Sequence, residues 1–414
     1  MRKALGIILT LILLLSLLAA VILFINRDEK KEIVLEYWTH EDESREKLEE
    51  RLIKEFESTH KNVRIHRVSY PSSEHINMVP AAFYSNNGPA IFSLIQTSLP
   101  PLLKGGYLDE YPRALEEVKD SYIDNVLDAA TSSGHLYGLP MEYTSWVLYV
   151  NDDEIAGLDA SLLSTWEGIK ELSESLVEKE DGVIVKRGFD FRYPYYLNFL
   201  IPMVNQLGGG IDIVDDHYEL IKPEAWTHVL DFFKSWGPNG EGLGSPTYKN
   251  ARTVFPEGKA AMMLSGLYHE ERLENEDLGF SWSVHPFPTF KDGVDTGGAN
   301  YLHYWSVNNN LSKKEKKIAW EFIEFLSQHY NEYLEEVGLI LPKKELYKSL
   351  SDSDIPYIEI FKDDLNKSSF IFTGTSSERL RAILEDVVNE IMLKGLDSTK
   401  CVEYLSSVIK TLPL

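Results

Sequence analysis

The sequence contains a single cysteine, Cys401, and this scarcity excludes two kinds of stabilising chemistry. One thiol cannot form a disulfide within the chain, and it cannot build a zinc site from cysteine ligands. Cys401 lies in a segment with a helical pattern, so its simplest interpretation is a small buried side chain.

Basic residues are also few for the length. The chain of 414 residues has 41 Lys and Arg against 65 Asp and Glu, which gives a formal net charge of -24. Binding to nucleic acid requires clustered Lys and Arg that neutralise phosphates, so no nucleic-acid partner is expected. A polyanionic ligand attracted over a long range is disfavoured for the same reason. Most of the acidic excess is expected on the solvated surface.

Sequence motifs for catalysis and cofactors are missing as well. The His-Glu pairs that begin at His40 and His269 lack a second histidine four residues after the first, so neither is a zincin motif. No phosphate-binding loop, dinucleotide fingerprint or GxSxG elbow is present. Carboxylate pairs are too common in an acidic chain to indicate a glycosidase. We therefore predict no enzymatic activity, no cofactor and no metal ion.

The N-terminus carries a strong hydrophobic signal. Arg2 and Lys3 precede an apolar stretch from Ala4 to Ile25, and Arg27 follows it. A secretory signal has an apolar core of roughly 7–15 residues, whereas a membrane-spanning helix needs about 20. The sequence LAAV at 18–21 resembles a lipoprotein cleavage box, but Val21 stands where the lipid-bearing cysteine would be. Residues 1–27 are predicted to be an uncleaved anchor, with a cleaved signal peptide as the alternative, and both place the remaining chain outside the cytoplasm.

Beyond a short polar linker, strand-like and helix-like segments alternate. IVLEYW (33–38), VRIHRVSY (63–70) and AIFSLIQ (90–96) have the pattern of strands, and a helix of about 75–84 separates the last two. Between the first two strands, a helix is predicted from the apolar spacing of Leu48, Leu52, Ile53 and Phe56. This alternation predicts an α/β protein with mostly parallel sheets.

Helix ends are marked by residues typical of caps. Ser164 with Glu167, and Ser312 with Glu315, have the spacing of capping boxes. Pro223 is predicted to open a helix that ends before Gly237. A late helical stripe, Leu380, Ile383, Leu384, Val387 and Ile391, ends before Gly395.

Aromatic residues are abundant, with 22 Tyr, 18 Phe and 8 Trp. Most are expected in the core. Three segments place them instead beside Glu, Arg, Asn or His: GHLYGLPMEYTSWVLYVN (134–151), FDFRYPYY (189–196) and NYLHYW (300–305). Aromatics mixed with planar polar groups in turn-rich segments are typical of a ligand site. The mixture suits a sugar, which has an apolar face and a rim of hydroxyls.

Several of these segments occur in the order found in one protein family. LEYWTHE, GPAIFSLIQ, GGYLDEY, the 134–151 segment, TWEGIKEL, QLGGGIDI, FPEGKAAMMLSG, VHPFPTFKDGVDTGGAN and KIAWEFIEFLS span about residues 33–345. This series resembles the extracellular solute-binding proteins of bacterial ABC transporters, family 1, the maltose- and oligosaccharide-binding type. Ala90 departs from the family's usual Asp, and Val21 from the lipid-bearing Cys.

The resemblance implies a two-lobed periplasmic-binding-protein fold of type II, with a ligand cleft at the hinge. The first lobe would comprise 33–143 and 296–330, and the second 144–295 and 331–414. Hinge segments are expected near 142–146, 295–299 and 326–333. The implied function is a monomeric extracytoplasmic receptor, which captures a carbohydrate, an oligosaccharide by preference, and delivers it to a membrane permease.

Candidate ligand residues follow from the same resemblance, because the family's cleft is lined by loops after the first strands, by the crossings and by the second lobe. They are His40, Glu41, Asp42, Gln96, Thr97, Tyr143, Thr144, Trp146, Arg192, Tyr193, Tyr195, Tyr268, Asn300 and Tyr301.

Two alternatives stay open. One is a binding protein of the same fold for ferric iron, which the tyrosines at 193–196 could serve, or for another small solute. The other is a polysaccharide-degrading enzyme, which would also use aromatics with carboxylates. For Trp146, we expect the ring to face the cleft. The rival is a buried strand residue that shares a face with Leu148 and Val150 by period-two alternation.

Overall fold

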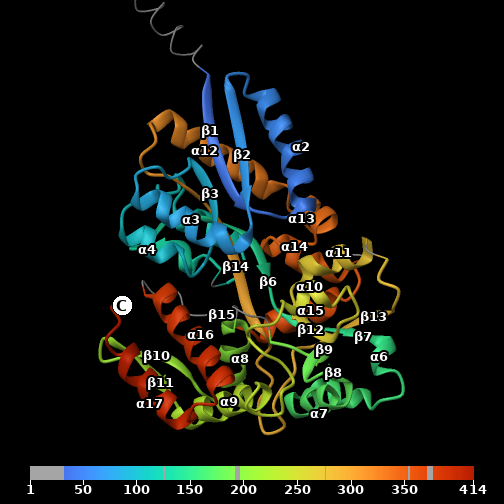
Figure 1. Cartoon of the computed structure of the whole chain (residues 1–414). Coiled ribbons are helices and arrows are strands. Elements are labelled where there is room, and N and C mark those ends of the chain that lie inside the picture. Colours follow the sequence, from blue (N-terminus) through green and yellow to red (C-terminus); the bar gives the residue numbers. More distant parts are fainter. Residues whose placement is uncertain (1–31, 125, 192–195, 276, 353–354, 371–375) are drawn as a thin grey trace, which may run out of the picture.

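The computed structural model describes residues 32–414, apart from 125, 192–195, 276, 353–354 and 371–375 (Figure 1). The predicted anchor at 1–27 lies outside this described part of the chain. Within it, no helix combines the length and the hydropathy that a bilayer crossing requires.

Two sheets organise the molecule, and helices flank each of them (Figure 1). The first sheet has the order β15-β14-β3-β1-β2, with β6 also paired to β14. Strands β1, β2 and β3 are parallel, and β14 is antiparallel to β3 and β6. Its strands are β1 (Ile33–His40), β2 (Val63–Tyr70), β3 (Ile91–Ile95), β6 (Leu139–Thr144), β14 (Ala299–Val307) and β15 (Ser369–Phe370).

The second sheet has the order β13-β7-β12-β9-β8. The expectation of mostly parallel sheets is wrong here: among its described strands only β9 and β12 pair in parallel. The reason is that β7 follows one crossing from the first sheet and β13 precedes the other crossing back to it. As a result, β7 runs antiparallel to both β12 and β13. Its strands are β7 (Val147–Asn151), β8 (Glu178–Glu180), β9 (Val183–Phe189), β12 (Ala260–Ser265) and β13 (Trp282–His285). Two hairpins lie outside both sheets, β4 (Thr131–Ser132) with β5 (His135–Leu136), and β10 (Gly210–Val214) with β11 (His217–Ile221).

Helices pack on the first sheet as the apolar stripes predict. Leu48, Leu52, Ile53 and Phe56 are all buried, and their helix α2 contacts β2, α12 and α13. Helix α3 contacts all three parallel strands. The helices around this sheet are α2 (Glu43–Thr59), α3 (Ser72–Tyr84), α4 (Leu99–Lys104), α5 (Leu115–Val118), α12 (Lys313–Gln328), α13 (Tyr330–Val337) and α14 (Lys344–Ser349).

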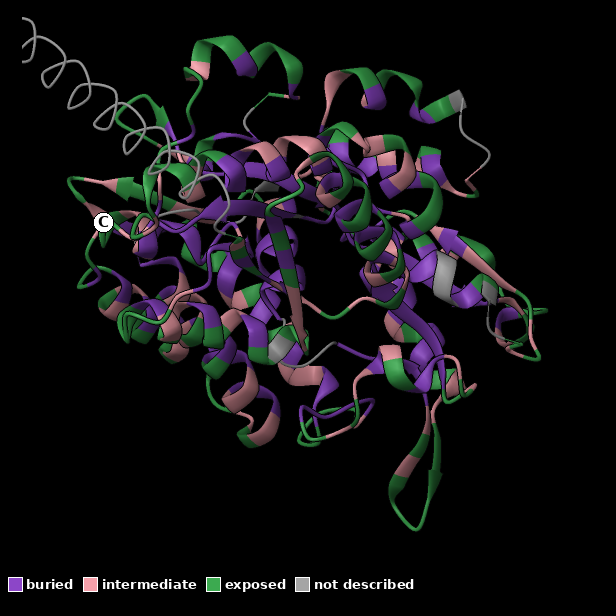
Figure 2. Ribbon diagram, turned by 90° about the horizontal axis from the view of Figure 1, so that it is seen from above, coloured by how far each residue is buried: buried purple, intermediate pink, exposed green. Residues whose placement is uncertain are grey.

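Around the second sheet, the predicted helix stripes are again buried, except that Ile383 is only partly buried. Pro223 opens α9, whose core side chains include Trp226 and Trp236, and Gly395 ends α16 in the left-handed conformation. The remaining helices are α6 (Asp152–Ile155), α7 (Trp166–Leu176), α8 (Leu197–Gln206), α9 (Pro223–Trp236), α10 (Ala251–Val254), α11 (Glu270–Asn275), α15 (Ile358–Lys367), α16 (Ser377–Lys394) and α17 (Ser398–Ile409). Figure 2 shows the buried residues gathered on the strands and on the inward faces of these helices.

Of the two predicted capping boxes, one is confirmed and one is displaced. Ser312 and Glu315 form the reciprocal pair at the start of α12. At α7 the cap is Thr165, not Ser164: the Thr165 hydroxyl accepts from Gly168 N, whereas the Ser164 hydroxyl donates to Ser161 O. The preceding 3-10 turn includes Ser164, so only Thr165 has the extended backbone that a cap requires.

The chain passes between the sheets at the segments where the sequence places two crossings. Ser145 and Trp146 separate β6 of the first sheet from β7 of the second. The second passage runs from β13 to β14, through Gly297 and Gly298. No passage occurs at 326–333, where we expected a third, because α13 packs against α2 of the first sheet. The domain boundaries drawn from the sequence otherwise remain predictions.

Candidate functional site

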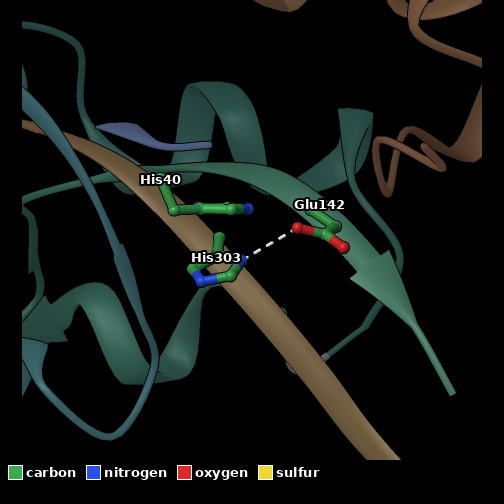
Figure 3. Close-up of side chains that lie close together, drawn as sticks. All are labelled: His40, Glu142 and His303. Atoms are coloured by element: carbon green, nitrogen blue, oxygen red, sulfur yellow. Dashed lines mark hydrogen bonds and ion pairs between the residues drawn. The ribbon is translucent and has the colours of Figure 1, made fainter. Parts of the chain in front are cut away.

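Polar side chains converge where β1, β6 and β14 lie near each other in the first sheet. His40 is the last residue of β1, and the antiparallel register of β6 and β14 places Glu142 opposite His303. A register shift follows His303, and such bulges re-aim side chains in many sheets. Figure 3 shows the His40 ring above that of His303, with Glu142 to the right of both.

The three side chains contact one another directly. His303 Nδ1 lies 2.9 Å from Glu142 Oε2, and the His40 and His303 rings stack with centroids 4.6 Å apart (Figure 3). Glu142 and His303 are buried, at 2% and 6% exposure. A fourth polar side chain, His75 of α3, lies beside them, with its ring centroid 6.1 Å from that of His40.

Arginine side chains lie behind this cluster. Arg45 of α2 donates from Nη1 to His40 Nε2 at 3.2 Å and from Nη2 to the His40 carbonyl oxygen. Glu49 accepts hydrogen bonds from Arg67, Tyr37 and Tyr333, at 2.7, 3.0 and 3.0 Å. Glu49 is thus paired with Arg67, its charge also favours the Arg45 cation, and the network fixes the end of β1 on α2.

The imidazoles of His40 and His75 are neutral at physiological pH. Burial lowers the pKa of His40 well below its usual value, and the nearby Arg45 and His303 add to the effect. Burial also lowers the pKa of His75, to about 4, despite its hydrogen bond to Ser93 O. A neutral imidazole has one donor and one acceptor, which suits hydroxyl groups rather than anions.

The triad also fits the donor spacing of a metal site. One ligand atom each from His40, Glu142 and His303 lie within 4.8 Å of one another, and two histidines with a carboxylate can hold a divalent transition metal. The charge of the surroundings opposes this use. Arg45 donates to His40 Nε2, so a metal at that nitrogen would break the bond and face a guanidinium. The absence of a metal ion stays a prediction.

Several predicted ligand residues use their side chains to hold the protein together. Gln96 accepts from Leu302 N at 2.9 Å and donates to Asn300 O at 3.4 Å, so it ties the end of β3 to β14. Asn300 donates to Tyr143 OH at 3.3 Å and to Ser368 O at 3.2 Å. Sequence reasoning placed these residues in the right region but could not see these partners.

Other predicted ligand residues from the first sheet and its crossing make different contacts. Thr97 donates to Glu378 of α16 at 2.7 Å, and Thr144 accepts from Leu267 N at 3.3 Å. Asp42 caps α2 and accepts from Arg45 N at 2.8 Å, whereas Glu41 is exposed.

Two further candidates, Tyr268 and Tyr301, come from the SGLYHE segment and from β14. Tyr268 is half-buried, with the Arg252 guanidinium 5.8 Å from its ring centroid. Tyr301 lies opposite Thr144 in the β14–β6 register. Arg192, Tyr193 and Tyr195 lie outside the described residues.

Trp146 is not where we expected it. Its side chain is 2% exposed and lies in the same core as Leu148 and Val150, while Val147 and Tyr149 belong to the other core. It packs edge-to-face on Phe199, with ring centroids 5.7 Å apart. The alternation of β7 therefore begins at Trp146, as the rival interpretation has it.

Sequence reasoning missed His75, Arg45, Glu378 and the pairing of Glu142 with His303. These residues come from separate elements, and only the register of β6 against β14 brings Glu142 to His303. The one available signal was an unusual number of polar residues in otherwise apolar strands, as at Glu142 and His303.

Comparison with known proteins agrees with this architecture. The sequence model described as bacterial extracellular solute-binding protein matches residues 51–335. The chain belongs to this family. It is therefore a member of a family of binding proteins that work outside the cytoplasm.

A curated relative and several solved structures resemble this solute-binding protein. The galactooligosaccharide-binding protein of Bacillus subtilis (strain 168) is 23% identical over 290 residues, which cover 67% of this chain and 65% of the relative. The alignment thus spans slightly less than two thirds of that protein's length.

The structural neighbours share the fold along almost the whole chain. An ABC substrate-binding protein from Listeria monocytogenes in complex with cycloalternan has a TM-score of 0.78 at 16% identity, covering 92% of this chain and 98% of its own. A solute-binding protein from Thermotoga lettingae bound with α-D-tagatose has a TM-score of 0.80 at 15% identity, covering 92% and 99%. The two-lobed periplasmic-binding-protein fold expected from the sequence is confirmed.

Proposed function

We propose that this solute-binding protein is the receptor of an ABC importer and captures a carbohydrate, preferably an oligosaccharide, between its two sheets. The observation that carries the proposal is the gathering of polar side chains from β1, β6 and β14 beside the crossings between the sheets. In open α/β sheets, ligands bind at the carboxyl ends of the strands, and His40 ends β1.

The names of the relatives support a sugar as the solute. One is named as a galactooligosaccharide-binding protein, and solved neighbours hold cycloalternan, maltotriose and mannotriose. The neutral imidazoles of His40 and His75 agree with a neutral polyhydroxylated ligand. We propose that His40, Glu41, Asp42 and Tyr268 contact it, together with Arg192, Tyr193, Tyr195 and Tyr301.

Binding would work by population shift. A ligand that touches both lobes binds the closed arrangement better than the open one, and only this difference in affinity can drive closure. The closed receptor would then be recognised by a membrane permease. The protein acts as a monomer and performs no chemistry on its ligand in this account.

A thermal-shift screen tests the proposal. Purified protein is heated with galacto-oligosaccharides, maltotriose, mannotriose and monosaccharide controls, and a ligand that binds only the folded state must raise the melting temperature. At a hundredfold excess over Kd the stabilisation is about 2.7 kcal/mol. If no sugar shifts the melting temperature but ferric iron does, the ligand is a metal ion and not a carbohydrate. Mass spectrometry that found the sugar cleaved would make the protein an enzyme.

We also propose that the N-terminal apolar segment remains attached as an anchor. The motivation is its length and the valine at position 21, where a lipid-bearing cysteine is absent. Edman sequencing of protein from the native membrane checks this proposal. The anchor predicts an N-terminus at or near residue 1, and a mature end near residues 20–28 would contradict it.

A further inference from the structure

Two passages between the sheets, at 145–146 and at 297–298, meet one buried carboxylate. Asp364, in α15, accepts a hydrogen bond from the Ser145 hydroxyl on the first passage. It also accepts from the Gly298 backbone N–H on the second passage, with its two oxygens at 3.1 and 3.0 Å. The two passages are far apart in the sequence, and Asp364 bonds directly to both of them.

The contact is too close for ordinary side chains. A Cβ on Gly298 would lie 2.4 Å from the Trp146 carbonyl oxygen. Gly297 has a φ of +64°, and a Cβ there would lie 2.7 Å from the Asp364 carbonyl oxygen. Glycine is thus required at both positions, because it alone permits this approach of the two passages and α15.

The last turn of α15 holds the second passage by further bonds. Lys367 donates to Asp295 at 2.8 Å, and Ser368 bonds Asn300 through both its hydroxyl and its carbonyl oxygen. Directly afterwards, β15 pairs with the first residues of β14. The end of α15 is therefore anchored on the strand that leaves the second passage.

We propose that Asp364 couples the two passages, so that the two sheets move about one defined hinge and not about two independent ones. Without its carboxylate, each passage could bend separately, and the sheets would sample a wider range of relative positions. The coupling itself does not depend on the proposed function; only the use of the hinge motion in ligand capture rests on it.

The surroundings of Asp364 are consistent with an ionised carboxylate in neutral solution. It is 3% exposed, and burial raises its pKa to about 6, while the bonds from Ser145 and Gly298 lower it. Asp295 also raises this pKa and Lys367 lowers it. At pH 7.5 the group is therefore charged and accepts the bonds described.

Spin-label distances between the lobes test the coupling without any ligand. The full chain, with Cys401→Ser, carries label cysteines at Lys61 beside the first sheet and Glu180 on β8, both exposed. Asp364→Ala is compared with Asp190→Ala, which removes an equally buried carboxylate that pairs with Arg187 away from the passages. We expect a broader distance distribution with a longer-distance population for Asp364→Ala, and an unchanged one for Asp190→Ala.

Two milder variants keep the test decisive if Asp364→Ala does not fold. Ser145→Ala removes one bond to the carboxylate, and Asp364→Asn removes its charge; both should broaden the distribution to a smaller extent. Distributions that superimpose on the parent in all folded variants would overturn the coupling. Because the measurement needs no sugar, a failed sugar screen would leave its result interpretable.

Discussion

The imidazole of His75 donates a hydrogen bond from Nε2 to the Ser93 carbonyl oxygen at 2.7 Å. A carbonyl can only accept, so Nδ1 of the neutral ring is a bare acceptor. That nitrogen is buried, and no donor among the described residues reaches it. His75 thus fixes α3 on β3 as a neutral ring, at the edge of the proposed ligand site.

His75 should make stability fall in mild acid. Its pKa is lowered from the ordinary 6.5 to about 4, so the unfolded chain binds the proton first as pH falls. The stabilisation is therefore present above pH 6.5 and is lost toward pH 4, by about 2 kcal/mol between pH 7.5 and 5. The advantage of the wild type over His75→Gln in urea unfolding should shrink by that amount. An advantage that stays constant down to pH 5 would contradict a neutral His75.

Glu270 should act in the opposite direction. It is 3% exposed, and no donor among the described residues reaches either carboxylate oxygen. Burial, with a smaller effect of Glu274, raises its pKa from 4.5 to about 8. Its contribution is full below pH 4.5 and is lost as pH rises through 8, so Glu270→Gln should gain about 3.5 kcal/mol on the wild type between pH 5 and 8. Urea unfolding across this range measures the gain, and the exposed Glu41→Gln is the control, with no change expected.

Substitutions of Trp146 distinguish a role in core packing from a role in ligand contact. Because its ring is buried in the second core, Trp146→Ala should cost about 3–5 kcal/mol of unfolding free energy, while Trp146→Phe should retain most of the stability. Chemical denaturation measures both. A variant with normal stability and lost sugar affinity would restore our first expectation that the ring faces the ligand.

Gln96 allows a matched comparison between the two sheets. Gln206, the last residue of α8 beside the second sheet, has a similar role: it donates to Pro288 O at 2.8 Å and accepts from Phe290 N at 3.2 Å, both in the loop after β13. Either residue changed to alanine leaves a buried backbone N–H without its partner, at a cost of about 1–3 kcal/mol. We expect similar losses of stability and no change in affinity for any sugar that the screen identifies. Weaker binding in Gln96→Ala alone, measured by calorimetry, would make Gln96 a ligand residue.

Local sequence patterns predicted the helices and strands of this fold well, for physical reasons. The strand at 63–70 and the capping box at Ser312 and Glu315 depend on neighbours within a few residues, which the sequence displays directly. The cap of α7 was displaced by one residue, because the 3-10 turn that absorbs Ser164 is set by packing.

Side-chain roles in the site were less accessible. Gln96 bonds Leu302 across 206 positions, and Asn300 bonds Ser368 across 68. A resemblance of segment order predicts that these residues lie near one another, but not whether an amide faces a ligand or a strand. The two passages at 145 and 298 were found from segment order, whereas Asp364, which joins them, lies in no recognised motif.

Small-angle scattering tests the central claim, capture of a sugar between the sheets, most directly. The radius of gyration is measured with and without a sugar that raises the melting temperature, at saturating concentration. If the ligand bridges the two lobes, the radius of gyration must fall, because the closed form is the one that binds more tightly. A radius of gyration that is identical with and without the bound sugar would contradict capture by closure.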